Sequence, residues 1–493
     1  MKPNIALIKQ KFQLFDKTGL SLDQIRVLQV LIWGVLGGTV WANITGGAAM
    51  TSYMKELGAS DTLYGFVFAL PPLANAFQFL ASYWMERTLQ RTKMFLVTGF
   101  IQRLVWLPFA LVPVFIPMSH PQIRLMCAVI LAVLSAGMAP FMNVSFFSLF
   151  NDAVPLNIRG RYLASRSRIA TVVGLGMGLV VARLLDTLPV YTNYVVVFLI
   201  AAVFGTFDIC CFLLCRLPEM QPRPEKARML DMIKGVLADK RYMRIVLSIT
   251  CWLFSVQIGS PFFSVYTLAP VSEGGMGMTM TQVISTGQIM YNLGLILCIA
   301  HWGRAMDSYG SKPVLVVAAF LTAFMPAIWF RIGPGMLALA AFGSLYSGAT
   351  YCAVDLSQQN LFMSQAPDKN RSMYFAVYFI FTQLVGLALG SIVGGFMLDN
   401  VLIRIDSMHL TLGGLAFNRY HAMFVLTMVL RLLSALLLLA RIDDGAPGQT
   451  GLMIRNMVAA PGEFSKKLRY VVRQRLVRMK YHKQRQQEGG TDD

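Results

Sequence analysis

The chain has 493 residues, of which 56% are apolar and only 14% are charged. A soluble protein of this length needs more charge to stay dissolved, and many apolar runs reach the roughly 20 residues that span a bilayer. Composition therefore excludes a soluble protein and indicates an all-α polytopic membrane protein. The net charge of +19 does not indicate nucleic acid, because the basic residues gather in alternate short loops and in the tail, as membrane topology requires.

Twelve apolar segments are expected to cross the membrane, six on each side of a polar linker. Residues 1–27 form a basic lead-in without the features of a cleavable signal peptide. The first bundle, 28–215, has predicted spans at 28–52, 62–84, 94–116, 124–150, 162–185 and 190–215. The linker, 216–243, begins with prolines and continues as a short amphipathic helix. The second bundle, 244–441, has predicted spans at 244–268, 281–302, 313–331, 335–363, 372–398 and 420–441.

Basic residues alternate between the two sides of this topology. The basic loops are 86–93, 151–161, 216–244, 303–312 and 368–371, together with both termini. The positive-inside rule therefore places both termini in the cytoplasm. The basic tail, 442–493, carries one apolar helical face with Phe464, Leu468, Val471, Val472, Leu476 and Met479. Such a helix could lie on anionic lipid, and a solvated tail that anchors the topology is an equal alternative.

One stretch of the first bundle recurs in the second at a fixed offset. Residues 143–178 match 355–390, 212 residues later. Under that offset the equivalent pairs are Ser135 and Ser347, Pro155 and Pro367, Arg159 and Arg371, Tyr162 and Tyr374, Gly174 and Gly386, and Gly178 and Gly390. An offset kept from one apolar segment through a loop into the next indicates a duplicated half, and many transporters have their substrate site between such repeats.

The loop after the eighth span carries a compact polar motif, HWGRAMDSYGSKP at 301–313. Gly303 would allow close helix approach, Asp307 could pair with a base or cap the next helix, and Gly310 would permit a tight turn. The motif resembles the loop signature of the major facilitator superfamily (MFS). With the span count and the repeat, the resemblance covers the chain to about residue 441. The first-half counterpart, 84–93, keeps the tryptophan and the bases but lacks both glycines and the aspartate.

The resemblance implies a transporter of two pseudo-symmetric six-helix bundles around a central cavity, working by alternating access. Residues 152–162 (DAVPLNIRGRY) look like the DxVPxxxRGRY loop of a bacterial subgroup, which implies the bacterial inner membrane. The proline of the motif typical of drug/proton antiporters is missing from span 5, which argues against a drug exporter. The resemblance assigns gating or structural roles to Asp152, Arg159, Arg304, Asp307, Gly310, Lys312 and Arg371.

Polar residues on spans that line the cavity in this family are candidate substrate contacts. An unpaired polar group inside the membrane costs roughly 2–7 kcal/mol, so each needs a partner or a function. The candidates are Trp41, Asn43, Thr45, Gln78, Asn143, Gln257, Gln288, Tyr291, Asn292, Asp355, Gln358, Gln359, Tyr378 and Gln383, with Ser145 and Tyr351 nearby in sequence. For any single amide or aromatic side chain, a contact that only holds two helices together is an equal alternative.

Charged residues within the spans are the sharpest candidates. Burial favours the protonated form of a carboxyl, so Asp355 could take up a proton or a cation with the substrate. A carboxylate paired with a base, or capping a kinked helix, is the alternative. Arg103 and Asp208 lie at similar depth and are expected to form a structural ion pair; Arg431 could be a similar structural residue. Arg166 and Arg168 are interpreted as interfacial anchors rather than ligands for an anion.

Three functions remain open from the sequence. The leading hypothesis is secondary active transport of a small organic solute by a monomer, as symport or antiport and coupled to protons through Asp355. A lipid or lysolipid translocator, or a transporter-like scaffold or sensor acting through the tail, is the alternative. No nucleotide-binding loop, zinc pattern or catalytic triad is present, so neither an enzyme nor a cofactor is expected. The seven cysteines show no disulfide or metal spacing.

Overall fold

The computed structural model describes residues 22–214, 229–367, 371–408, 411–412, 415–439, 442 and 449–459. These residues are almost entirely helical and contain twelve helical segments long and apolar enough to cross a membrane. Each coincides with one of the predicted spans, so the predicted span count and the all-α class are confirmed. The lead-in before residue 22 and the amphipathic face expected at 464–479 lie outside the described residues.

The chain divides into two compact units, and the first comprises residues 1–53 and 77–224. Its helices are α2 (Leu22–Thr45), most of α3 (Ala48–Glu56), α5 (Gln78–Thr88), α6 (Arg91–Leu104), α7 (Trp106–Phe115), α8 (Pro121–Ala153), α9 (Leu156–Thr187), α10 (Thr192–Cys211) and the short η1 (Phe212–Leu214). Aromatic rings fill one end of its core: Tyr53 packs on Phe109 with ring centroids 5.3 Å apart, and Trp106 stacks on Phe198 at 5.7 Å.

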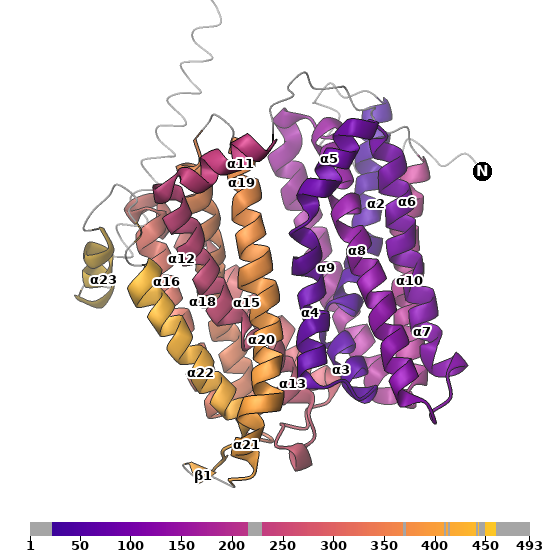
Figure 1. Ribbon diagram of the computed structural model, residues 1–493, viewed down its shortest axis with the longest axis vertical. Coiled ribbons are helices and arrows are strands. Elements are labelled where there is room, and N and C mark those ends of the chain that lie inside the picture. The colour runs from indigo at the N-terminus through magenta and orange to yellow at the C-terminus, as the bar shows by residue number, and fades with distance from the viewer. Residues whose placement is uncertain are drawn as a thin grey trace, which may run out of the picture. The chain divides into compact units, whose positions relative to one another are not determined.

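The second unit comprises residues 54–76 and 225–493. After the linker helix α11 (Met229–Ala238), the helices of the first four spans of the second half are α12 (Lys240–Gln257), α13 (Ser260–Leu268), η2 (Val271–Glu273), α14 (Met280–Val283), η3 (Ile284–Ile289), α15 (Met290–Tyr309), α16 (Ser311–Ala323), α17 (Met325–Phe330) and α18 (Leu337–Gln365). The amphipathic helix expected in the linker is α11, which Figure 1 shows across the ends of its neighbours beside α19.

The last two spans of this unit are interrupted by π-helical turns. They consist of α19 (Arg371–Ile380), η4 (Phe381–Leu389), α20 (Gly390–Phe396), η5 (Met397–Leu402), α21 (Ile403–Asp406), α22 (Arg419–Leu433) and η6 (Ser434–Leu438); α23 (Gln449–Ala459) follows. A two-residue antiparallel pairing, β1 (Thr411–Leu412) with β2 (Leu415–Ala416), connects α21 to α22. Turns of π-helix leave backbone groups unpaired and are frequent at functional sites.

The duplication seen in the sequence has a structural counterpart. Gly174 on α9 lies against Thr39 and Asn43 of α2, the first span of its half. Gly386 on η4 lies against Leu253 and the Thr250 carbonyl of α12, the first span of the second half. Each glycine therefore lets the fifth span of its half approach the first, which explains why the two positions share the repeat.

The segment 54–76 belongs to the second unit although it comes early in the sequence, and its helix is α4 (Asp61–Asn75). Pro71 and Pro72 lie inside α4, and the helix ends at Asn75, before α5 begins in the first unit. A Cβ on Gly65 would lie 2.4 Å from the Ser391 carbonyl oxygen, and one on Gly395 would lie 2.3 Å from that of Asp61. The two glycines thus allow direct backbone contact between α4 and α20, a contact that the sequence did not predict.

Two predicted loops are mostly helical. The loop predicted at 151–161 shrinks to Val154 and Pro155 between α8 and α9. The motif after the eighth span is also helical as far as Tyr309, because α15 continues through it.

One predicted role in that motif was wrong, and one of the two alternatives for Asp307 is excluded. A Cβ on Gly303 would meet nothing within 4 Å, so close helix approach is not its purpose. Asp307 does not cap α16, whose N-cap is Gly310 without a side-chain hydrogen bond. Gly310 itself has φ +90°, which confirms the expected tight turn.

Candidate functional site

Asp355 lies in the middle of the 29-residue helix α18 and is only partly buried. Among the described residues it has one hydrogen bond, which is weak: the Gln358 Nε2 donates to its Oδ1 at 3.4 Å. Across the residues described here, no lysine, arginine or histidine forms an ion pair with it. The sequence alternative in which Asp355 pairs with a nearby base therefore has no support in this part of the chain, and the carboxylate needs another explanation.

Three tyrosines lie within electrostatic range of this carboxylate. Tyr291 of α15, Tyr351 of α18 and Tyr378 of α19 each interact electrostatically with Asp355. Cys352, on the same helix, also lies within electrostatic range. Tyr351 is one helical turn before Asp355, and a close crossing of α15 and α18 at Gly348 brings the backbone of Tyr291 alongside: a Cβ on Gly348 would lie 1.9 Å from the Tyr291 carbonyl oxygen. We call Tyr291, Tyr351, Asp355, Gln358 and Tyr378 the Asp355 cluster.

The other candidates of the second unit form separate contacts. Gln257 of α12 donates to the Ser391 hydroxyl at 3.1 Å, which joins two helices as the alternative interpretation proposed. The Asn292 amide donates to the Gln288 carbonyl one turn earlier, at 2.8 Å. Gln359 is exposed and Gln383 is partly buried. Whether any of them contacts a substrate remains a prediction.

In the first unit, Arg103 and Asp208 form an ion pair between α6 and α10. The Arg103 Nη2 lies 3.0 Å from the Asp208 Oδ2, both side chains are buried, and the Arg103 guanidinium lies 3.6 Å from the centre of a Trp41 ring. Gly34 and Gly38 of α2 leave room for the carboxylate, since a Cβ on either would lie 2.9 Å from one of its oxygens. Trp41 is therefore packed against this pair, and its role as a substrate contact remains a prediction.

The remaining first-unit candidates lie along helix surfaces. The Asn43 amide donates to the Thr39 carbonyl and the Thr45 hydroxyl to the Trp41 carbonyl, each at 3.0 Å along the same helix. Gln78 is partly buried at the start of α5, where it takes part in a polar interaction, and Asn143 is partly buried on α8. Nothing in these contacts separates a binding role from a packing role.

At the end of the first unit that carries the basic loops, Asp152 pairs with Arg91. The buried Arg91 guanidinium donates to the Asp152 carboxylate and also to the Ser148 hydroxyl at 2.9 Å. Sequence reasoning did not select Arg91, although a base opening α6 opposite an acid ending α8 was a usable signal.

The side chains of Arg159 and Arg371 lie outside the described ones. In the motif after span 8, the Arg304 Nε donates to the Ala300 carbonyl at 3.1 Å, and Asp307 and Lys312 each take part in a polar interaction.

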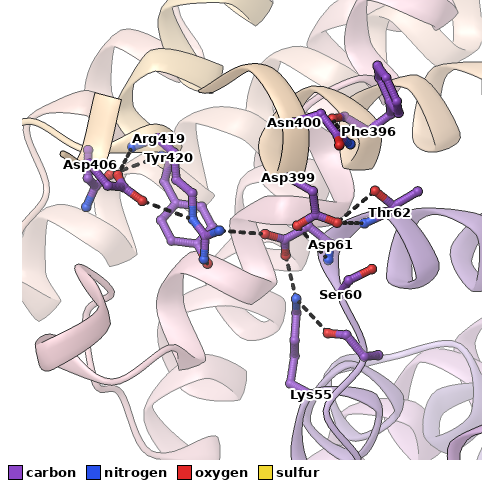
Figure 2. A network of polar contacts seen from close by, with 12 residues as sticks. Lys55, Ser60, Asp61, Thr62, Phe396, Asp399, Asn400, Asp406, Arg419 and Tyr420 are labelled. Atoms are coloured by element: carbon purple, nitrogen blue, oxygen red, sulfur yellow. Dashed lines mark hydrogen bonds and ion pairs between the residues drawn. The ribbon is translucent and has the colours of Figure 1, made fainter. Parts of the chain in front are cut away.

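A second polar site in the second unit was missed by the sequence. The carboxylate of Asp61, only 2% exposed, pairs with Lys55 and, at 3.5 Å, with the Nη1 of Arg419. Arg419 also pairs with Asp406, whose Oδ1 accepts its backbone N–H at 2.8 Å. Figure 2 shows Asp61 between Lys55 and Arg419. We call these residues, with Asp399 and Thr62, the Asp61 network.

Asp399 of η5 accepts hydrogen bonds from the first turn of α4. One carboxylate oxygen accepts the backbone N–H of Asp61 at 3.2 Å, and the other accepts the N–H and the hydroxyl of Thr62, each at 2.7 Å (Figure 2). Free N–H groups and the helix dipole make this end of α4 favourable for a negative charge. The network thus joins residues about 340 positions apart, which no local sequence pattern could reveal.

Comparisons with known proteins agree on one family. The family model of the Major Facilitator Superfamily matches residues 30–384 and 277–477. No curated protein sequence matches the chain.

Solved transporter structures share the fold at low sequence identity. A D323A mutant of the nucleoside transporter NupG has a TM-score of 0.63 and 15% identity, covering 84% of this chain and 99% of its own. A D-xylose-proton symporter has a TM-score of 0.62 and 14% identity, covering 86% of this chain and 98% of its own. The xylose transporter XylE from E. coli, in a partially occluded inward-open conformation, has a TM-score of 0.57 and 14% identity, covering 86% and 100%. Identities this low establish a common fold and nothing about the substrate.

Proposed function

The chain belongs to the major facilitator superfamily, and from this premise we propose that it moves a small organic solute across the membrane by alternating access, coupled to protons. It is an integral membrane protein with a transporter fold. Symport and antiport both fit this proposal, and no enzymatic activity is part of it.

Asp355 carries the proposal. Among the described residues, the titratable groups within electrostatic range of it are Tyr291, Tyr351, Tyr378 and Cys352, and none of them is basic. A partly buried carboxylate without a counter-charge is costly as an anion. Binding a proton or another cation neutralises this charge and is therefore favourable. The carboxylate then has a charged and a neutralised state, and a transport cycle can use the change between them.

The Asp61 network joins the two halves of the sequence, and we propose that the transport cycle breaks this contact. The helix α4 comes from the first half of the sequence, yet Asp61, Thr62 and Gly65 bind residues of the second half. In alternating access the two halves separate on one side and then on the other. Residues 56–61 and 399–419 connect spans on the side opposite the basic loops and are poorer in Lys and Arg or balanced by acids. The positive-inside rule therefore assigns them to the outer side. We therefore assign the Asp61 network to the outer gate.

The remaining parts of the proposal rest on sequence patterns. They comprise the bacterial inner membrane, cytoplasmic termini, the subgroup with the DxVPxxxRGRY loop, a monomeric state and contact of the basic tail with anionic lipid. A reporter fused after Asp493 tests the orientation, since it must be active only in the cytoplasm.

The function is tested in two steps with the full-length protein. A thermal-shift screen of the purified protein identifies solutes that raise its apparent melting temperature, because a ligand that binds only the folded state stabilises it. Each hit is then added to liposomes that contain the protein and a pH-sensitive dye. Solute-dependent proton movement supports the proposal. Stabilisation by lysolipids alone, with lipid movement between leaflets, would instead favour the lipid translocator.

A further inference from the structure

Two acceptor oxygens of the Asp355 cluster have no hydrogen-bond donor among the described residues. The second carboxylate oxygen of Asp355 has no hydrogen bond within the described part of the chain, and the buried Gln358 Oε1 has none either. The hydroxyls of Tyr291, Tyr351 and Tyr378 also make no hydrogen bond to the described residues. The tyrosine hydroxyls can donate or accept, whereas the carboxylate and amide oxygens can only accept, so a group that brings hydrogen-bond donors would satisfy them.

The other aspartates with a polar role inside the spans do not share this situation. Asp208 has Arg103 at 3.0 Å, and Asp61 has both Lys55 and Arg419. Asp399 has the positive end of α4. The fold thus supplies positive charge to each of these three carboxylates. Within its described residues Asp355 has no ion-pair partner, and the base Arg431 interacts electrostatically with Tyr351 of the same cluster. The missing positive charge is consistent with a ligand that provides it.

The aromatic groups around Asp355 suit the same kind of ligand. Tyrosine rings attract cations through the negative potential of their faces, and aromatic side chains around one carboxylate are a common arrangement for binding ammonium groups. Tyr378 is held in place by stacking on Phe362, with ring centroids 4.0 Å apart. The Tyr378 ring therefore does not depend on a ligand for its position, which reduces the entropy lost on binding.

We propose that the Asp355 cluster binds the ammonium group of a cationic amine, which is the substrate class of this transporter. The proposal rests on the proposed function, and it adds that the solute carries a positive charge. The ammonium N–H groups would donate to Asp355 and to the Gln358 carbonyl oxygen. A proton taken up by Asp355 would compete with the amine for the same carboxylate.

The test measures binding to the purified full-length protein by thermal shift and by titration calorimetry. The probes are the protonated amines 2-phenylethylamine and putrescine, with 2-phenylethanol as the uncharged analogue of the first. At least one amine is expected to bind, and 2-phenylethanol is not. Asp355→Asn should weaken that binding roughly tenfold to hundredfold, as loss of a charged hydrogen-bond partner does. Glu86→Gln, which removes an exposed carboxylate on α5, should leave binding unchanged.

A second variant keeps the test decisive if Asp355→Asn does not fold. Tyr291→Leu removes one aromatic ring and no charge. This variant should bind the same amine severalfold more weakly than the wild type, and its binding of 2-phenylethanol should stay undetectable. If no amine binds at millimolar concentration, or if both variants bind as the wild type does, the inference is overturned.

Failure of this inference differs from failure of the proposed function. If the protein moves an uncharged or anionic solute with protons and amines do not inhibit that movement, the amine class is wrong and the transporter stands. If an amine binds but neither it nor any other solute crosses the membrane of the liposomes, binding stands and transport does not.

Discussion

Replacing Asp399 by asparagine should weaken the Asp61 network, and the structure gives the size of the effect. The carboxylate accepts three hydrogen bonds from the first turn of α4. Hydrogen bonds to a charged acceptor contribute about 1.5–3 kcal/mol and neutral ones about 0.5–1.5 kcal/mol. An asparagine can keep the two bonds to Thr62, but it loses the charge at the helix N-terminus, about 0.5–2 kcal/mol, and faces the Asp61 N–H with its own NH₂ group. A total loss of about 2 kcal/mol corresponds to roughly 30-fold in the equilibrium between closed and open outer gate.

Cysteine labelling measures this shift. Ala69 of α4 is fully buried, so Ala69→Cys in a cysteine-free background should react with a membrane-impermeant thiol reagent only when the outer gate opens. The labelling rate should rise about 30-fold in Asp399→Asn, in proportion to the open population. Glu56→Gln, at an exposed position that ends α3, is the control and should leave the rate unchanged. Equal rates in Asp399→Asn and the parent protein would refute the assignment of the network to the outer gate.

Two further substitutions test the packing and the ion pair. Gly65→Ala places a Cβ 2.4 Å from the Ser391 carbonyl oxygen and should lower the melting temperature, whereas Gly137→Ala, with nothing within 4 Å, should not; equal melting temperatures would contradict direct backbone contact. Arg103→Met leaves Asp208 buried without its cation and should cost about 3–5 kcal/mol of stability, measured as loss of the folded fraction on heating. Adding Asp208→Leu should recover part of it, and no recovery would argue against a structural pair.

The spans were predictable because each depends only on local composition. A helix that crosses a bilayer needs an unbroken apolar run, and the twelve runs show this directly in the sequence. The loop boundaries were less predictable because polar residues near the end of a span do not necessarily end the helix. For example, α15 continues through Gly303 and Asp307 to Tyr309. The tight turn at Gly310 was predicted correctly because few residues other than glycine adopt a positive φ.

A polar site could be predicted when the residues that define it stand out in their own stretch of sequence. Asp355 stood out because a carboxylate within an apolar span is rare, but the lack of a basic partner needed the three-dimensional structure. The pairing of Arg103 with Asp208 could be inferred because both lie at the same depth. The Asp61 network could not, because Asp61 and Arg419 are each ordinary at the end of a span and meet only through the packing of α4 in the second unit.

The most direct test of the central claim is solute-driven proton flux in liposomes, compared between the wild-type protein and Asp355→Asn at equal protein content. The account predicts that a solute found in the thermal-shift screen moves protons with the wild type and that Asp355→Asn abolishes this flux, while the variant keeps its melting temperature. Undiminished proton flux in Asp355→Asn would contradict coupling through Asp355.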